Sequence, residues 1–397
     1  MKQFQGYERP DGSVGVRNKI LVISPVDCSY SEASKIATSV PGATAITQYY
    51  GCHRDKMIEN QFTSLAENPN IGGVLLVGQG CESITVDNLM SKIEKTGKPV
   101  ESVTSQEDGG TLKTIEKGKR LIRDISQKIS DLEKEPFDIG KLTVAVHCGG
   151  SDSTSGLAAN PATGRAIDKL IEAGGSSIFS EAPEMIGGED ILAERAEDEE
   201  VAKEIYDLIN KAELWVKARL GEPRFMSKGN KEGGLTTLEE KSLGAILKGG
   251  SKKIKGVLEN SHEKLEKPKE PGLYLQDGTS TTDVSSITQK LAAGAQIAVF
   301  TTGRGATMGH AIAPVIKVTG NPLTYEEMED DMDINAGKII EGSASIEEVG
   351  NRIFEEIVDV ASDKTTKSES LGYDNFDLWR YHPAIRNLIK KVPKEKL

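Results

Sequence analysis

The sequence contains few cysteines and no close cysteine pair. Only four occur among 397 residues, and they are far apart in the chain: Cys28, Cys52, Cys81 and Cys148. Four widely spaced cysteines in a chain of this length do not make a disulfide framework. Because no Cys-x-x-Cys pair is present, a zinc ribbon is not indicated either.

Long apolar runs and an excess of basic charge are also missing. No run approaches the roughly 18 apolar residues of a transmembrane helix, and residues 1–9 lack the apolar core of a signal peptide. We therefore expect a cytoplasmic protein with no membrane partner. The formal net charge of −12 argues against nucleic acid as a partner, because a nucleic-acid-binding face is basic.

Several catalytic motifs are absent. The chain has no Walker A motif, no Gly-x-Ser-x-Gly elbow and no His-Glu-x-x-His zinc motif. The Gly303-x-Gly305 segment lacks the third glycine and the following helix of a dinucleotide fingerprint, so a nicotinamide site is poorly supported. These absences set aside the common nucleotide-dependent and serine-hydrolase classes.

The chain does contain a regular alternation of apolar runs and helical segments. Its length predicts two domains of roughly 150 residues each. Buried-strand patterns occur in both halves, for example at residues 19–24, 73–77 and 142–146, and helix-like segments follow them. This alternation predicts an α/β fold. We expect two doubly wound, mostly parallel-sheet domains, an N-terminal one over residues 1–133 and a C-terminal catalytic one over residues 141–397.

Four other segments carry weaker patterns. Residues 6–18 predict a short irregular arm around a Pro-Asp-Gly turn. Residues 133–140 predict a linker, because they combine proline with charge. Residues 191–220 predict one long acidic helix, and the Lys-rich residues 249–271 predict a solvated surface connection.

Three of the expected strands run into a cysteine with a polar or charged neighbour. Parallel strands place their carboxyl ends at one edge of a sheet, so these groups predict a shared polar site. Histidine and cysteine there are suited to hold a metal, carry a proton or act as a nucleophile, or they form a core turn instead. The metal-ligand candidates are Cys52, His53, Cys81, Glu82 and Cys148.

A second set of residues is suited to complete that site. His147 and Glu181 lie at strand ends as candidate proton carriers, and His310 is a further one. Lys231 and Arg304 lie in Gly-rich segments and are candidates for holding a substrate carboxylate. The small polar candidates for substrate binding are Ser151, Asp152, Ser155 and Asn230.

Motifs along most of the chain resemble the catalytic part of the altronate and galactarate dehydratase family. The matching motifs include Gly6-Tyr7, Val14 to Asn18, Gly80-Cys81-Glu82, Cys148 to Asp152, Gly229-Asn230-Lys231, Phe300 to Gly305 and Asp333 to Gly337. The resemblance implies an iron-assisted hydro-lyase that needs Fe²⁺ or Mn²⁺. It would remove water between C2 and C3 of a sugar acid such as altronate or galactarate, giving a 2-keto-3-deoxy acid.

The resemblance leaves open which metal cofactor is bound and which residue has which catalytic role. A divalent ion would bind substrate oxygens while a histidine or a carboxylate moves the proton, and the candidates His147, Glu181, Lys231, Arg304 and His310 fit those roles. The alternative cofactor is an iron–sulfur cluster on Cys52, Cys81 and Cys148. Three thiolates with one open iron position suit a dehydratase.

The chain departs from the family pattern at its front. Single-chain members carry a small N-terminal domain before the Gly-Tyr motif, which lies here at residue 6. The resemblance therefore implies the large subunit of a split enzyme, with the small domain supplied by a separate subunit. A homo-oligomer is the default expectation for such an enzyme.

Two other activities compete with the dehydratase. Gly187-Gly188-Glu189 and residues 234–241 resemble the large subunit of sulfolactate sulfo-lyase, which eliminates sulfite instead of water. Cys52 and Cys81 are shared with the dehydratases, which favours the hydro-lyase. The third possibility is a non-catalytic subunit that binds a metal or a sugar acid.

Overall fold

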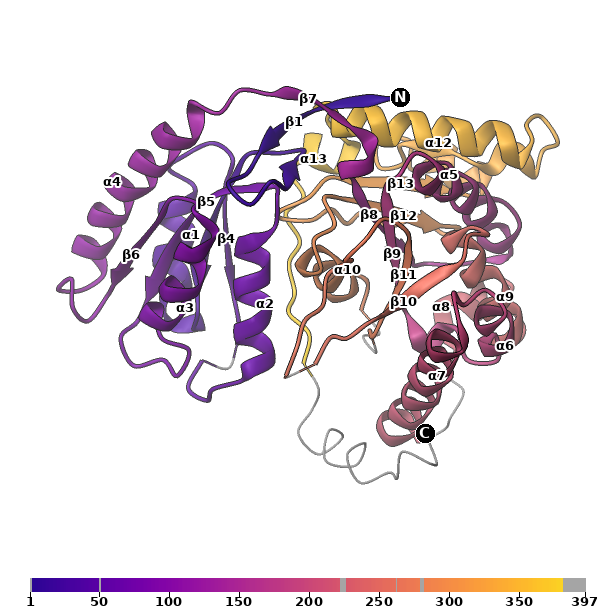
Figure 1. Ribbon diagram of the computed structural model, residues 1–397, viewed down its shortest axis with the longest axis horizontal. Helices are drawn as coiled ribbons and strands as arrows, with labels where there is room; N and C mark the ends of the chain where they lie inside the picture. The colour runs from indigo at the N-terminus through magenta and orange to yellow at the C-terminus, as the bar shows by residue number, and fades with distance from the viewer. Residues whose placement is uncertain (1, 50, 222–225, 262, 279–281, 381–397) are drawn as a thin grey trace.

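The computed structural model describes residues 2–49, 51–221, 226–261, 263–278 and 282–380. It contains two large parallel sheets, each covered by helices, and one small antiparallel sheet between them (Figure 1). The predicted α/β class with two parallel sheets is confirmed. None of the described helices is long and apolar enough to cross a membrane.

The first sheet has the strand order β4-β3-β5-β6, and every neighbouring pair is parallel. The strands are β3 (Lys19–Ser24), β4 (Ala43–Thr47), β5 (Ile71–Gly78) and β6 (Val100–Thr104). All residues of β5 are buried, as expected of a strand covered on both faces. One face packs on α1 (Tyr30–Ala37) and α4 (Thr111–Ser130), the other on α2 (Lys56–Glu67) and α3 (Val86–Ile93).

The second sheet has the order β10-β11-β9-β8-β12-β13-β14 and is also parallel throughout. Its strands are β8 (Thr143–Cys148), β9 (Ser176–Phe179), β10 (Ile254–Leu258), β11 (Leu273–Gln276), β12 (Ile297–Thr302), β13 (Val315–Thr319) and β14 (Ile334–Asn335). The chain starts in the middle at β8, extends the sheet on one side, and then extends it on the other side from β12. Ligands of open parallel sheets bind at such a switch point, beyond the strand ends.

Helices cover both faces of this sheet. The pair α5 (Asn160–Glu172) and α12 (Ile346–Ala361) packs against one face, whereas α10 (Asp283–Ala292) packs against the other and faces the first sheet (Figure 1). The remaining helices are α6 (Glu189–Ala193), α7 (Glu199–Leu220), α8 (Lys228–Glu232), α9 (Leu238–Ile246), α11 (Pro322–Glu327) and α13 (Lys367–Ser370).

The expected arm and linker are instead strands of one antiparallel sheet. Its order is β2-β1-β7, with β1 (Gln3–Glu8), β2 (Val14–Gly15) and β7 (Glu135–Asp138). Phe4 lies opposite Phe137 in the register and is 1% exposed. The arm and linker predictions were wrong because β1 and β7 are short and mostly polar, and each pairs with the other from a distant part of the sequence.

Two further expectations were wrong for similar reasons. The expected surface connection 249–271 contains β10, an edge strand held by parallel pairing with β11. The expected single helix 191–220 is two helices, and Asp198 caps the second by accepting a hydrogen bond from the Val201 amide at 3.0 Å. The strand β10 was missed because charged residues surround it in the sequence. The break between α6 and α7 was missed because the helical periodicity of residues 191–220 does not show it.

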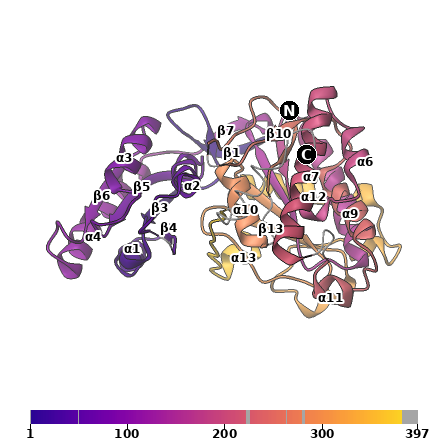
Figure 2. The same cartoon turned by 90° about the horizontal axis from the view of Figure 1, so that it is seen from below.

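The two large sheets lie side by side (Figure 2), and two buried asparagines join them. Asn68 Nδ2 donates to the carbonyl oxygens of Leu291 and Ala295, each at 2.8 Å. Asn70 Nδ2 donates to Gln296 O at 2.8 Å. A buried amide that makes such bonds is costly to remove, because its partners lose theirs. The relative position of the sheets therefore depends on these contacts.

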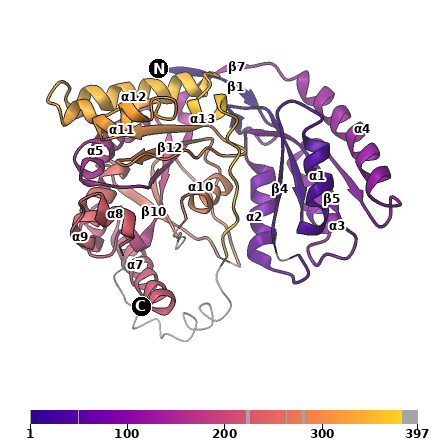
Figure 3. The same cartoon turned by 180° about the vertical axis from the view of Figure 1, so that it is seen from behind.

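The C-terminal segment 371–380 also crosses between the sheets, where it runs between α10 and α2 (Figure 3). Asn375 accepts hydrogen bonds from the Gly309 and Ala311 amides at 3.0 and 3.1 Å. Gln61 Nε2 of α2 donates to Trp379 O at 2.7 Å. The segment thus ties the first sheet to the second.

We expect Asn70→Ala to destabilise the whole chain. The substitution leaves the Val16 amide and two carbonyl oxygens without their partner, at a cost of roughly 2–4 kcal/mol. Urea unfolding measures the change, and Gln127→Ala on the exposed face of α4 is the matched control, expected within about 0.5 kcal/mol of wild type. Equal stability of the two variants would contradict the role of Asn70.

Candidate active site

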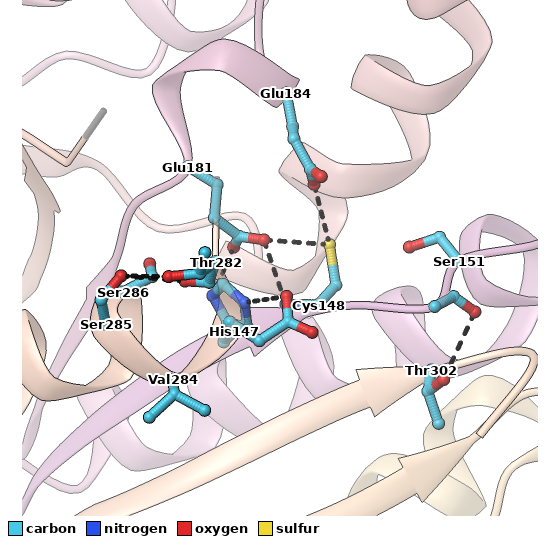
Figure 4. Close-up of polar contacts among 12 residues, drawn as sticks. His147, Cys148, Ser151, Glu181, Glu184, Thr282, Val284, Ser285, Ser286 and Thr302 are labelled. Atoms are coloured by element: carbon cyan, nitrogen blue, oxygen red, sulfur yellow. Dashed lines mark hydrogen bonds and ion pairs between the residues drawn. The ribbon is translucent and has the colours of Figure 1, made fainter. Parts of the chain in front are cut away.

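The strand β8 ends at the switch point with His147 and Cys148, both buried. His147 Nε2 lies 3.0 Å from Asp283 Oδ1 at the start of α10. His147 Nδ1 lies 3.3 Å from Glu181 Oε2, directly after β9. The imidazole therefore lies between two carboxylates that come from different elements. Figure 4 shows it beside Glu181 and Cys148.

Glu181 has an unusual backbone. Its φ is +82°, and the only other described non-glycine residue with positive φ is Asp363. A non-glycine residue in this conformation costs of order 1–3 kcal/mol and persists where its surroundings hold it, often at functional sites. Here Oε1 accepts a hydrogen bond from the Cys148 amide at 3.3 Å, and Oε2 lies 2.8 Å from Lys248 Nζ.

Three buried lysines complete the cluster. Lys241 of α9 contacts Glu184 Oε2 at 2.7 Å and Ser151 Oγ at 2.8 Å. Lys248, in the turn after α9, also contacts the Cys148 sulfur at 3.3 Å, and Lys290 of α10 lies 3.3 Å from His147 Nδ1. The side chains of Lys241, Lys248 and Lys290 are almost or entirely buried.

The strand-end pattern does not single out these lysines or Asp283. Lys241 follows two glutamates in an exposed-looking helical sequence, and Lys248 precedes Gly249-Gly250 in a Lys-rich stretch. A buried ammonium is tolerated only beside opposite charge, and its partners here come from distant segments. The local sequence therefore does not predict which carboxylates pair with these lysines.

Burial and charge shift the pKa values of the cluster in different directions. Burial raises the pKa of the Cys148 thiol to about 11 and lowers that of Lys290 to about 8. Burial alone would lower the pKa of His147, but Glu181 outweighs it and the pKa is raised. Burial alone would raise the pKa of Glu181, but His147 and Lys248 hold it well below its usual value. The site thus combines an ionised carboxylate with a histidine that carries a proton more readily than usual.

A cavity of about 80 Å³ lies beside the cluster. Its polar wall includes His147, Glu181, Glu184, Lys241 and Asp283. Its apolar wall includes Pro183, Val216, Leu220, Met226 and Leu238. Space of this size holds a few water molecules at roughly 30 Å³ each, so the cavity gives a small ligand access to both the histidine and an ammonium group.

Of the small polar candidates, the structure brings Asn230 to this cavity. Asn230 lines it and donates from Nδ2 to Ser151 O at 3.0 Å. Asp152 and Ser155 instead stabilise the turn after β8, since Asp152 Oδ1 accepts the Ser155 amide at 3.1 Å. They therefore shape the loop that carries Ser151.

Lys231 and Arg304 do not line the cavity. Lys231 is exposed on α8. Arg304 is partly exposed, and its Nη1 donates to Gly229 O at 2.7 Å and lies 3.3 Å from Glu232 Oε2. Arg304 therefore fastens α8 to the loop after β12.

His310 lies away from the cavity, in the core between α10 and the C-terminal segment. Its Nε2 is 2.9 Å from Thr288 Oγ1, and its ring lies edge-on to Phe376. Burial lowers the pKa of His310 to about 3. These contacts give it a packing role.

The other cysteine candidates lie at the carboxyl edge of the first sheet. Cys52, His53 and Cys81 are exposed there. Glu82 is buried and accepts the Gly80 amide at 2.6 Å. Cys148 belongs to the second sheet and contacts its lysines, so the five predicted ligands do not form one group.

Family models match almost the whole chain. The D-galactarate dehydratase/altronate hydrolase second-domain model covers residues 6–130, and the D-galactarate/altronate dehydratase C-terminal model covers residues 139–384. The chain belongs to the galactarate/altronate dehydratase family. The predicted resemblance is thereby confirmed.

Named relatives in this family are lyases with different leaving groups. The chain is 34% identical to the beta subunit of (2R)-sulfolactate sulfo-lyase from Chromohalobacter salexigens, over 96% of this chain and 98% of that protein. It is 32% identical to altronate dehydratase from Bacillus subtilis and 33% identical to galactarate dehydratase (L-threo-forming) from Escherichia coli. These alignments cover 96% of this chain but 78% and 77% of the relatives. The family supports a lyase activity and leaves the substrate open.

The donor atoms present do not fit a single resident Fe²⁺ or Mn²⁺ ion. Among the described residues, one group places three donors close together, namely Cys148, Glu181 and Glu184 within 4.8 Å of one another. Each of these donors already contacts the ammonium of Lys241 or Lys248 at 2.7–3.5 Å. The lysines supply the positive charge that an ion would bring, so we assign no catalytic step to a metal.

We expect His310→Gln to weaken the acid sensitivity of the fold. In the unfolded chain this histidine has its ordinary pKa, so below about pH 6.5 the unfolded state binds a proton that the folded state excludes. Wild-type stability is therefore lost as the pH falls below that value. Between about pH 7.5 and pH 5 wild type should lose about 2 kcal/mol more than the variant in urea unfolding. Parallel pH profiles would contradict a neutral buried His310.

Thiol labelling should separate Cys148 from the other cysteines. The thiolate is the reactive form, and Cys148 is buried with a pKa of about 11, whereas the other three thiols are exposed. We expect three fast reactions with a disulfide reagent and one slow reaction that Cys148→Ala removes. Four equally fast thiols would contradict the burial of Cys148.

Proposed function

We propose that this chain is the large subunit of a split hydro-lyase that dehydrates a sugar acid such as altronate or galactarate to a 2-keto-3-deoxy acid. The observation that carries the proposal is the buried imidazole of His147, which lies between two carboxylates and beside the Lys290 ammonium group at the switch point. Family membership supplies the lyase class.

The residues that face the cavity suit this elimination. His147, with its raised pKa, takes the proton from C2, and the C–H electron pair forms the C2–C3 double bond. The C3–O bond breaks, and the same proton leaves with the hydroxide as water. The resulting enol then tautomerises to the 2-keto acid.

The neighbouring charges hold the proton carrier and the substrate. Glu181 and Asp283 orient the imidazole of His147 and stabilise its protonated form. Lys241 is the cluster lysine that lines the cavity, and its ammonium is suited to bind the substrate carboxylate, where negative charge increases as the C2 proton leaves. Lys248 and Lys290 keep Glu181 ionised.

The family resemblance implies a requirement for Fe²⁺ or Mn²⁺, which the lysine-paired donors Cys148, Glu181 and Glu184 do not support. Chelation followed by addition of each ion tests it. Full activity after chelation would contradict that requirement without affecting the role of His147.

Sulfolactate sulfo-lyase is the second candidate function. The alignment covers 98% of the sulfo-lyase beta subunit but 77–78% of the two dehydratases, so this chain matches the length of a subunit. The chemistry at C2 is the same, and sulfite leaves from C3 in place of hydroxide. Both candidates imply a separate partner subunit.

Coexpression with the small partner subunit tests the proposal. The complex is screened against hexonates, hexarates and sulfolactate for 2-keto acid and for sulfite. We expect His147→Gln to lower kcat by about 10²–10⁴-fold, the usual contribution of a proton carrier, and Lys241→Met to raise KM. Lys203→Met, exposed on α7, is the matched lysine control with unchanged kinetics.

The outcomes separate the three functions. Sulfite release from sulfolactate alone would support the sulfo-lyase. Ligand-induced stabilisation without turnover of any hydroxy acid would support a non-catalytic binding subunit. Turnover that survives His147→Gln would contradict the assigned proton carrier.

A further inference from the structure

Three exposed cysteines lie in neighbouring loops at the carboxyl edge of the first sheet, whereas the candidate active site lies at the second sheet. Cys52 follows β4, Cys28 follows β3 and Cys81 follows β5. The order of the sheet is β4-β3-β5-β6, so these cysteines follow three neighbouring strands. The proposed elimination uses none of them.

Direct contacts hold the three cysteine loops together around Gly51. A Cβ at Gly51 would lie only 2.3 Å from Cβ of Val26, two residues before Cys28. The Ser83 amide donates to Gly51 O at 2.9 Å, and Ser83 Oγ donates to Cys52 O at 2.9 Å. Each cysteine is therefore within two residues of a contact that joins its loop to another.

The spacing of the donors argues against a single ion at this edge. Metal–sulfur bonds of about 2.3 Å place two thiolates on one ion at most roughly 4.6 Å apart. Among the described histidine, cysteine, aspartate and glutamate residues, no three donors of this edge lie within 4.8 Å of one another. An iron–sulfur cluster binds its cysteines on different irons and so accepts wider spacing.

We propose that Cys28, Cys52 and Cys81 bind an iron–sulfur cluster at this edge. Thiolates are soft ligands that select such clusters, and three of them leave one iron coordination position open. Cys148 does not belong to the set, because it is buried in the second sheet against Lys241 and Lys248. The proposed cluster site is therefore separate from the elimination site.

Anaerobic reconstitution of the full chain tests this proposal. The protein is incubated with ferrous iron and sulfide and then desalted. Bound iron, acid-labile sulfide and the visible charge-transfer absorbance are measured. We expect wild type and Cys148→Ala to retain all three signals, and Cys28→Ser, Cys52→Ser and Cys81→Ser each to lose most of the iron and sulfide.

A second measurement checks the cluster ligands directly. Reconstitution of the cluster should protect the exposed thiols of Cys28, Cys52 and Cys81 from a disulfide reagent. It should leave the slow reaction of Cys148 unchanged. Thermal unfolding checks that the serine variants are folded, which we expect because the three positions are exposed. Neither readout depends on enzymatic turnover.

Three results would overturn the proposal. Wild type that keeps no acid-labile sulfide after desalting has no cluster site. If the triple variant Cys28→Ser, Cys52→Ser, Cys81→Ser keeps the iron and sulfide content of wild type, the iron and sulfide are bound only adventitiously. Loss of the cluster in Cys148→Ala would place it in the second sheet instead.

Discussion

The neutralisation of buried charge around His147 is the constraint on which the second sheet depends. Glu181 and the ammonium groups of Lys248 and Lys290 are buried at the switch point, beyond the carboxyl end of β8. Removing one partner from such a group leaves an unpaired buried charge at a cost of roughly 3–5 kcal/mol. The elements that supply these charges, the loop after β9, the turn after α9 and α10, are therefore fixed relative to β8. The same fixation preorganises the imidazole for proton transfer.

Much of the fold follows from local sequence patterns, but its connecting strands do not. The apolar runs 19–24 and 73–77 predict β3 and β5 correctly, because a continuous apolar run directly indicates a strand that is buried on both faces. The strands β1 and β7 are short and contain few apolar residues, and β10 lies within a Lys-rich stretch that suggests an exposed connection. They form because a partner distant in sequence completes their hydrogen bonds, and no local pattern contains that information.

The candidate site divides in the same way. Residues that follow directly from a strand end, His147 and Glu181, are predictable because the end of a parallel strand is a known place for ligands. The lysines are not, since an isolated lysine in a charged stretch is normally exposed. The positive φ of Glu181 is equally invisible in the sequence. In the folded chain, Cys148 and Lys248 hold its carboxylate in place.

The carboxyl ends of parallel strands meet at one edge only when the strands belong to the same sheet. The prediction that grouped the cysteines applied this rule across two sheets. Cys52, Cys81 and Cys148 all follow parallel strands, yet the first two belong to the edge β4-β3-β5 and the third to the end of β8. Assigning each cysteine to its sheet replaces Cys148 with Cys28 among the exposed thiols. It also places Cys148 among lysines, where burial keeps it a neutral thiol. The cysteines of the one predicted metal site therefore divide between two chemically different places, one with exposed thiols and one with paired buried charges.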